Sequence, residues 1–256
     1  ISLSSILLKG LEKIVLLYMQ NTSLKNANWS KNNYAYRQGK CIDTALHDIV
    51  TNLEYAINNK ELAIFTFLDI NSAFSKSNLN KLINGEMKIP NLDSDIIRWI
   101  WSMMTEREVT TESQGQGTSK IKVSKIATQG IPQGGTLSPI IFNLLMEELI
   151  KKVPSNGPVK LYIFADDILL LSRGKDLNTI KGMVQEAISI VEKWAKESYL
   201  TFTAKKCKSM IFSKKKIIQG KRLKITNKYM EWVETYKYLG ITLDRTLSWK
   251  PHLEYI

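Results

Sequence analysis

The sequence has few of the residues that build covalent or zinc-bound frameworks. Only two cysteines, Cys41 and Cys207, and two histidines occur in 256 residues. Because their spacing matches no ligand pattern, a disulfide framework and a zinc cluster are both excluded. Two unpatterned thiols are typical of a reducing, intracellular setting. No apolar run reaches 18 residues, so we expect no membrane-spanning segment.

Acidic residues are also scarce relative to basic ones. The chain has 24 Asp and Glu against 36 Lys and Arg, a formal net charge of +12. A surface this basic favours polyanions such as nucleic acid, or an anionic membrane face. Nine basic residues and no acid fall between positions 205 and 224, which indicates either a track for phosphates or a solvated face.

The hydrophobic residues, 44% of the chain, are ample for a globular core. Their periodicity predicts helices, strands and hairpins in alternation. The first helix should bury Leu7, Leu11, Ile14, Val15 and Tyr18, with Ser4 or Ser5 as its cap, and Ser138 should cap the fourth. The expected helices are 1–20, 44–58, 93–105, 138–152 and 177–196; the strands are 63–70, 200–203 and 209–212; and the hairpins are 106–127 (turn at 115–117), 161–171 and 236–243.

Two adjacent carboxylates, Asp166 and Asp167, lie between two short apolar runs at 161–171. A tight turn there would make the stretch a hairpin with both acids at its tip. Two such charges about 4 Å apart repel by roughly 4 kcal/mol at an effective dielectric near 20. A divalent cation bound by hard oxygen ligands would offset that repulsion. The alternative is an ordinary acidic turn.

A third acid, Asp69, ends the expected strand at 63–70. The order of elements from 63 to 212 is the split βαβ pattern, which predicts an α+β fold: an antiparallel sheet with helices on one face. Such a sheet can bring Asp69 beside Asp166 and Asp167. Three converging carboxylates would suit two divalent ions that act in phosphoryl transfer.

Four short segments now identify a family resemblance. They are FLDI with AF at 67–74, GIPQGG with LSP at 130–139, FADD at 164–167 and YLG at 238–240. In this order and spacing they resemble the reverse transcriptase domain of non-LTR (LINE-type) retrotransposons, closest to the jockey-like and I-like groups. The resemblance covers essentially the whole chain, and because the chain starts at Ile1, we expect it to be a fragment of a longer polypeptide.

The resemblance implies a right-hand polymerase, with a palm and part of the fingers. One reverse transcriptase domain would cover 1–256. Its fingers would be 1–62 and about 76–129, its palm 63–75 and 130–215, and its primer-grip end 216–256. The thumb and the endonuclease would lie outside this fragment.

The resemblance also implies roles for particular residues. Two Mg²⁺ ions, which Mn²⁺ could replace, would be held by Asp69, Asp166, Asp167 and the carbonyl of Ile70. A lysine, either Lys206 or its neighbour Lys205, would face the leaving pyrophosphate. The remaining roles are nucleotide binding by Ala73, Phe74, Gln133 and Gly134, and template or primer binding by Arg37, Pro132, Tyr238, Leu239 and Gly240.

The implied activity is RNA-directed DNA synthesis from a primer 3′-hydroxyl. Its partners would be an RNA template, a DNA primer and deoxynucleoside triphosphates, in the nucleus, with a cytoplasmic ribonucleoprotein stage. The chain departs from the family at Ser75, where Asp is common, and at Thr203, where Asn begins an Asn-x-x-Lys pattern. A catalytically decayed nucleic-acid binder is therefore an alternative. An RNA-directed RNA polymerase fits less well, because Phe74 replaces the acid that would bind a 2′-hydroxyl.

Overall fold

The computed structural model describes residues 3–25, 27–84, 89, 92–114, 120–154, 156–215, 217 and 219–256. Its chain divides into two compact units. The first unit comprises Ile1–Asn28 and Ser72–Leu145, and the second comprises Trp29–Asn71 and Met146–Ile256. These limits differ from the expected division into fingers and palm, which stays a prediction.

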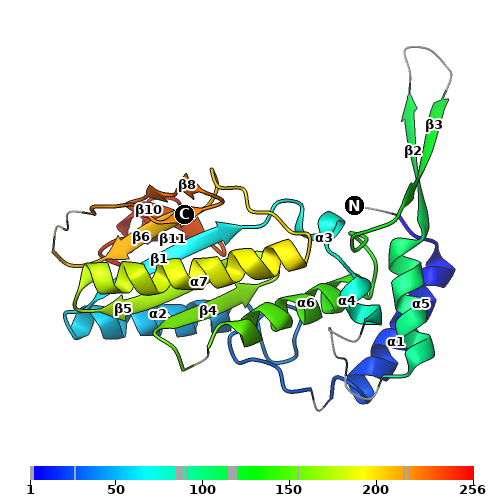
Figure 1. Cartoon of the computed structure of the whole chain (residues 1–256), viewed down its shortest axis with the longest axis horizontal. Helices are drawn as coiled ribbons and strands as arrows, with labels where there is room; N and C mark the ends of the chain where they lie inside the picture. Colours follow the sequence, from blue (N-terminus) through cyan, green and yellow to red (C-terminus); the bar gives the residue numbers. More distant parts are fainter. Residues whose placement is uncertain are drawn as a thin grey trace. The chain divides into compact units, whose positions relative to one another are not determined.

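The second unit is built around a five-stranded sheet with the strand order β4-β5-β1-β6-β9 (Figure 1). The central strand β1 (Leu62–Asp69) is antiparallel to both β5 (Asp167–Gly174) and β6 (Lys208–Phe212). Next to β5 lies β4 (Val159–Phe164), also antiparallel. A short parallel pairing joins β6 to β9 (Glu231–Trp232). The predicted α+β class with an antiparallel-rich sheet is confirmed.

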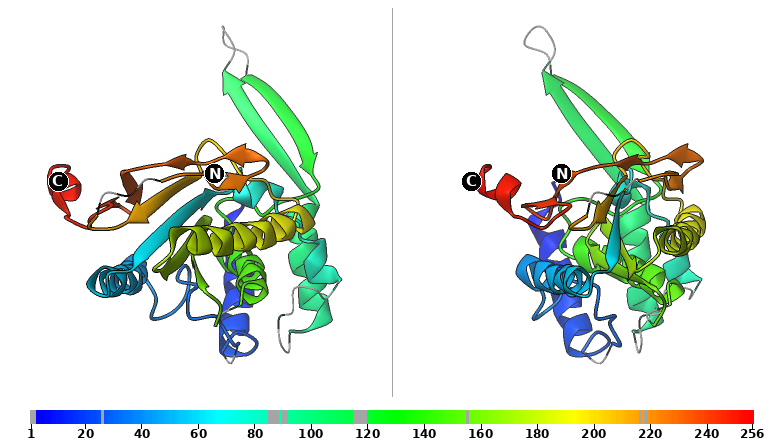
Figure 2. Two further views of the ribbon diagram at one scale, coloured as in Figure 1. Left: turned by 60° about the vertical axis from the view of Figure 1, so that its left-hand side comes forward. Right: turned by 90° about the vertical axis from the view of Figure 1, so that its left-hand side faces the viewer.

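Helices cover both faces of this sheet, so the prediction of helices on one face was wrong. Helix α7 (Leu177–Glu197) lies on one side and α2 (Ile42–Asn58) on the other (Figure 2). The reason is that β1 is apolar on both faces: its six inner residues are all buried. A strand of this kind needs cover on each side, because burial of apolar surface is what stabilises the sheet.

The face that α2 covers also receives a hairpin. Strands β10 (Thr235–Tyr238) and β11 (Ile241–Asp244) pair antiparallel, as predicted for 236–243. Tyr238 and Leu243 from this hairpin share a buried core cluster with apolar residues of α2, β1, β5 and β6.

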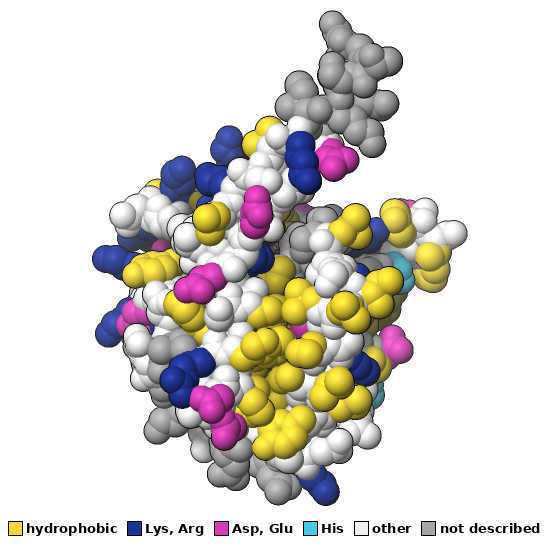
Figure 3. Space-filling view, turned by 90° about the vertical axis from the view of Figure 1, so that its right-hand side faces the viewer, with side chains coloured by type: hydrophobic (Ala, Val, Ile, Leu, Met, Phe, Trp, Pro, Cys, Tyr) yellow, Lys and Arg dark blue, Asp and Glu magenta, His cyan; other side chains and the backbone are white. Residues whose placement is uncertain are grey.

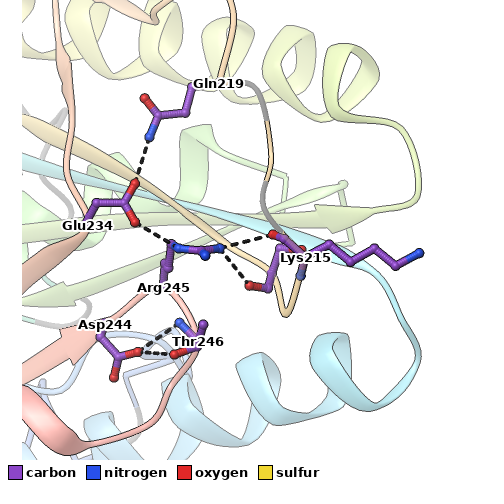
Figure 4. A network of polar contacts seen from close by, with 7 residues as sticks. Lys215, Gln219, Glu234, Asp244, Arg245 and Thr246 are labelled. Carbon is purple, nitrogen blue, oxygen red and sulfur yellow. Dashed lines mark hydrogen bonds and ion pairs between the residues drawn. The ribbon is translucent and has the colours of Figure 1, made fainter.

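An ionic network fixes the hairpin next to the end of β6 (Figure 4). The Arg245 Nε lies 2.9 Å from Glu234 Oε2. The same guanidinium donates hydrogen bonds to the carbonyls of Ser213 and Lys215, and Gln219 donates to Glu234 Oε1. Because one guanidinium ties three stretches of chain, the hairpin position is set by more than apolar packing.

The first unit contains α1 (Ile6–Asn21), capped by Ser5 as expected, and α5 (Ser94–Thr105). Strands β2 (Arg107–Gln114) and β3 (Lys120–Ala127) form the expected hairpin, whose predicted turn at 115–117 lies outside the described residues. Helix α6 (Ser138–Lys152) begins in this unit and ends in the other. The remaining short elements are α3 (Ala73–Lys76), α4 (Asn80–Ile83), β7 (Lys224–Ile225), β8 (Lys228–Tyr229) and α8 (Lys250–Leu253).

The apolar face of α1 is exposed, so the prediction that it belongs to the core was wrong. Leu7 is 87% exposed and Ile14 is 67% exposed, and Leu11 and Tyr18 are exposed as well. Figure 3 views the side where α1 and α5 lie and shows many hydrophobic side chains at the surface. Periodicity reports that a helix is amphipathic, but it does not report what covers the apolar face.

None of the helices formed by the described residues combines the length and the hydrophobicity that a membrane span requires.

The core around β1 yields a stability prediction. Phe65 is fully buried and its ring lies 4.7 Å from that of Phe212 and 6.0 Å from that of Phe67, centroid to centroid. We expect Phe65→Ala to lower the free energy of unfolding by about 3–5 kcal/mol, because it leaves a cavity at the sheet centre. Urea unfolding measures this, with the exposed Tyr229→Ala as control; a loss no larger than that of the control would contradict it.

Candidate active site

The register of the sheet brings two of the predicted acids face to face. Asp69, the last residue of β1, is the Cα partner of Asp167, the first residue of β5. Asp166 lies in the two-residue turn that joins β4 to β5. The other turn residue, Ala165, has a φ of +55°, a conformation that side chains with a Cβ adopt at a cost of about 1–2 kcal/mol. Local strain of this kind clusters at functional sites.

The charges of the three acids act on one another. Desolvation of its carboxyl group, together with the negative charges of Asp166 and Asp69, raises the pKa of Asp167 to about 6, although the residue as a whole is exposed. Desolvation is the largest cause of the raised pKa of the Tyr236 phenol, and the charges of Asp167 and Asp69 raise it further. Desolvation and the charge of Asp166 likewise raise the pKa of the Tyr36 phenol. All these groups therefore share one electrostatic environment.

Asp69 itself has an incomplete set of partners. Its backbone N–H donates to the Sγ of the buried Cys207, 3.3 Å away. Its Oδ1 lies 3.4 Å from the Lys206 ammonium. Its Oδ2 is buried and has no hydrogen-bond partner. An orphaned buried carboxylate oxygen is costly unless a further group binds it.

Hard carboxylate oxygens with an orphaned atom fit a divalent cation in their chemistry. Among the described residues, however, no three His, Cys, Asp or Glu side chains lie close enough together to hold a metal ion as they stand. A cation held by all three acids would need their carboxylates to lie closer together than they do here. The metal-binding roles predicted for Asp69, Asp166, Asp167 and the Ile70 carbonyl stay predictions.

The segment between α7 and β6 was predicted to contain a strand, and this prediction was wrong. Residues 200–203 form no strand; the only bridge joins Phe202 to Ile70, as far as the described residues show. Thr203 N–H donates to the Asp69 carbonyl, and Asn71 N–H donates to the Thr201 carbonyl. These bonds hold the end of β1 and place Lys206, rather than Lys205, in contact with Asp69. Its exposed ion pair is worth at most about 1 kcal/mol, so the contact positions Lys206 more than it stabilises the fold.

The predicted primer-grip residues lie in the same unit as the acids. Tyr238 is buried, and Leu239 and Gly240 form the two-residue turn between β10 and β11. Both turn residues have positive φ, +46° and +88°, as the turns that match strand twist require. In the same hairpin, Tyr236 stacks on Phe67, with ring centroids 3.9 Å apart. Because Phe67 stands two residues before Asp69, the hairpin packs directly beside the acidic strand end.

In the first unit, the structure brings Phe74 and the glycine-rich loop together. The Ile131 N–H donates to the Phe74 carbonyl at 2.6 Å, and the Gly130 N–H donates to the Ser77 carbonyl. Gly130 has a φ of +81°, and a Cβ there would lie 2.2 Å from the Ser75 carbonyl oxygen. Only glycine permits this close approach.

The other predicted nucleotide-binding residues surround that contact. Phe74 is half-buried and stacks on Phe142, with centroids 4.3 Å apart. Ala73 is buried, whereas Gln133 and Gly134 are exposed on the loop after the half-buried Pro132. The first unit thus gathers all five residues along one loop and the segment bonded to it, and their contacts with a nucleotide or template stay predictions.

Arg37 is engaged within its own loop. Its Nη1 donates to the carbonyls of Ser30 and Asn33, at 2.6 and 2.8 Å, and its guanidinium lies 5.3 Å from the centroid of the Trp29 ring. Desolvation lowers its pKa. The arginine therefore holds the loop in shape, and its contact with the template stays a prediction.

Three neighbours of the acids were absent from the sequence-based prediction. The Cys207 Sγ accepts a hydrogen bond from the Asp69 N–H. Desolvation and the charges of the acids raise the pKa of the Tyr36 and Tyr236 phenols. No motif marks them. The only signal was indirect: Cys207 directly follows the predicted lysine, and Tyr36 and Tyr236 lie within two residues of the predicted Arg37 and Tyr238.

The raised pKa of Asp167 yields a pH prediction for the metal-free protein. Its pKa rises from 3.8 in the unfolded chain to about 6 in the fold. The fold therefore holds the proton more tightly, and stability falls as the pH rises through this interval. Asp167→Asn should raise the melting temperature at pH 7.5 and should change it little near pH 4. An Asn variant that melts lower than the parent at pH 7.5 would contradict the prediction.

Comparison with known proteins agrees with the resemblance noted in the sequence. The model of the family described as "Reverse transcriptase (RNA-dependent DNA polymerase)" matches residues 1–243. The chain is 26% identical, over 81% of its length, to an RNA-directed DNA polymerase from the mobile element jockey of Drosophila melanogaster, of which it covers 22%. It is 22% identical, over 99% of its length, to a probable RNA-directed DNA polymerase from transposon BS of the same organism, of which it covers 28%.

The chain therefore spans about a quarter of the length of these curated relatives. Among solved structures, apo telomerase from Candida tropicalis superimposes with a TM-score of 0.59 at 14% identity, over 94% of this chain and 40% of the telomerase chain. This likeness shows a shared fold, a right-hand polymerase fold, and the family match extends over nearly all of the sequence. The chain belongs to the reverse transcriptase (RNA-dependent DNA polymerase) family.

Proposed function

We propose that this chain is the polymerase core of a non-LTR retrotransposon protein. It would add deoxynucleotides to a DNA primer 3′-hydroxyl, as directed by an RNA template. The observation that carries the proposal is the pairing of Asp69 with Asp167 across β1 and β5, with Asp166 in the adjoining turn. Three carboxylates at one sheet end suit nucleotidyl transfer, whose catalysis is mainly positioning and charge stabilisation.

Members of the family generally use divalent metal ions. We propose Mg²⁺, two ions per site with Mn²⁺ as a substitute, held by Asp69, Asp166, Asp167 and the Ile70 carbonyl. Bound there, the ions would lower the pKa of the primer hydroxyl and neutralise the negative charge of the phosphates. The net charge of the chain, +12, would favour the approach of RNA, DNA and triphosphate.

Residues of the chain itself would bind the pyrophosphate, select the sugar and hold the primer. Lys206, held at Asp69, carries an ammonium that can bind the leaving pyrophosphate. Phe74 presents a ring, stacked on Phe142, that would exclude a 2′-hydroxyl on the incoming sugar. The β10–β11 hairpin, fixed beside Phe67, would hold the primer end.

The proposed cellular setting rests on the family resemblance alone. Synthesis would take place in the nucleus, after a cytoplasmic stage as a ribonucleoprotein. The two alternatives, a decayed binder and an RNA polymerase, are outcomes of the tests below.

Neutralising one acid tests the catalytic role. In the complete encoded polypeptide, Asp166→Asn should reduce primer extension on RNA by at least about a hundred-fold, since loss of even an outer-shell partner of a metal ligand costs 10–100-fold. Extension is measured with radiolabelled primer, Mg²⁺ and all four deoxynucleotides. RNA affinity should stay unchanged, because the basic surface is intact.

The matched control is Asp95→Asn, which removes a carboxylate that is 81% exposed on α5. It should leave extension at the parental rate. Equal extension by the parent and the Asp166 variant would overturn the proposal. A parent that binds RNA but extends nothing with either ion would favour the decayed binder.

The Phe74 ring tests the choice of sugar. Phe74→Val should admit ribonucleotides about ten-fold or more better, because steric rejection in an apolar pocket is worth about 1–3 kcal/mol. Phe74→Tyr keeps the ring and should keep the preference. The measurement is the ratio of kcat/KM for a deoxynucleotide to that for its ribonucleotide. A parent that prefers ribonucleotides would instead support an RNA polymerase.

A further inference from the structure

Helix α1, most of whose residues are exposed, buries one charged side chain. Its described buried residues are Glu12 and Met19, and Glu12 is only 1% exposed. A buried carboxylate is unfavourable unless hydrogen-bond donors surround it. Its partners therefore indicate what the residue does.

The partners of Glu12 are backbone amides of the loop that leads into α6. The Thr136 N–H donates to Glu12 Oε2, and the Leu137 N–H donates to the same oxygen at 3.3 Å. Leu137 is fully buried. An ionised acceptor makes such bonds stronger than neutral ones. One side chain thus binds the amides of Thr136 and Leu137, the two residues directly before the first residue of α6, Ser138.

The expected cap does not perform this task. The hydroxyl of Ser138, the first residue of α6, is buried without a hydrogen-bond partner, so the prediction that Ser138 caps the helix was wrong. The loop is closed instead by the Gly135 N–H, which donates to the Pro132 carbonyl, and by the carboxylate from α1.

Gly135 packs closely against both Ser138 and the Glu12 carboxylate. A Cβ on Gly135 would lie 2.6 Å from Ser138 Oγ and 3.4 Å from each carboxylate oxygen of Glu12. The carboxylate and Gly135 also border an open groove of about 580 Å³, whose lining includes Gln133 and Arg107. Glu12 therefore bonds to the same loop whose residues border the groove.

We infer that Glu12 is a positioning residue, which holds the loop at 132–137 so that Gln133 and Gly134 are presented to the incoming nucleotide. The inference rests on the proposed function, because the nucleotide contact of that loop is part of it. In this role Glu12 acts on the loop, through the backbone amides of Thr136 and Leu137.

Two substitutions separate this role from a general effect on stability. Glu12→Gln keeps a carbonyl oxygen as acceptor and should keep the parental KM for deoxynucleotides. Glu12→Ala removes the acceptor and should raise that KM about ten-fold or more, since small misplacements of positioning groups cost up to about a hundred-fold. The control is Met19→Ala, which creates a cavity beside the same helix and leaves the hydrogen bonds from Glu12 to the loop in place.

The complete polypeptide is assayed for KM and kcat, and hydrogen exchange is followed at Thr136 and Leu137. We expect faster exchange at both amides in Glu12→Ala only. If Met19→Ala raises KM as much as Glu12→Ala, or if exchange at the two amides is unchanged in Glu12→Ala, the inference is wrong. If the parent shows no polymerase activity, the proposed function fails, whereas the exchange measurement still decides whether Glu12 holds the loop.

Discussion

The antiparallel register between β1 and β5 is the constraint on which the candidate site depends. It sets Asp69 opposite Asp167, and a slip by one residue would turn the side chains of β1 to the opposite face. The register is fixed because β1 is buried on both faces, so any slip would expose apolar side chains or bury polar ones. The position of the acids is thus a consequence of core packing rather than of contacts among the acids, which repel one another.

That repulsion explains the surroundings of the acids. Asp69 has a lysine on one carboxylate oxygen and no partner on the other, and Asp167 has a raised pKa. A fold that served only stability would not gather such groups, because each is unfavourable without a compensating cation. The packing around β1 offsets this cost: Phe65 and Phe212 contact each other, and Phe67 stacks on Tyr236.

Much of this could be predicted from local pattern. The alternation and length of apolar runs located β1, β5, β6, α2, α5 and α7 to within a few residues, because these elements bury long, regular faces. Patterns failed where a partner distant in sequence decides the outcome. The apolar face of α1 looks like a core face in the sequence yet is exposed. Ser138 looks like a cap, yet a carboxylate from Glu12, 126 positions earlier, binds the preceding amides. The acids could be found because they stand at strand ends in a recognisable order, whereas Cys207 and Tyr36 carry no such mark.

We propose that the sheet register creates one cation site from acids far apart in sequence. The most direct measurement is a titration of the protein with Mn²⁺, in which free ion is counted by electron paramagnetic resonance. The account predicts that Asp69→Asn and Asp167→Asn each weaken Mn²⁺ binding strongly, and that Asp95→Asn leaves it unchanged. Equal Mn²⁺ affinity in the parent and both site variants would contradict it.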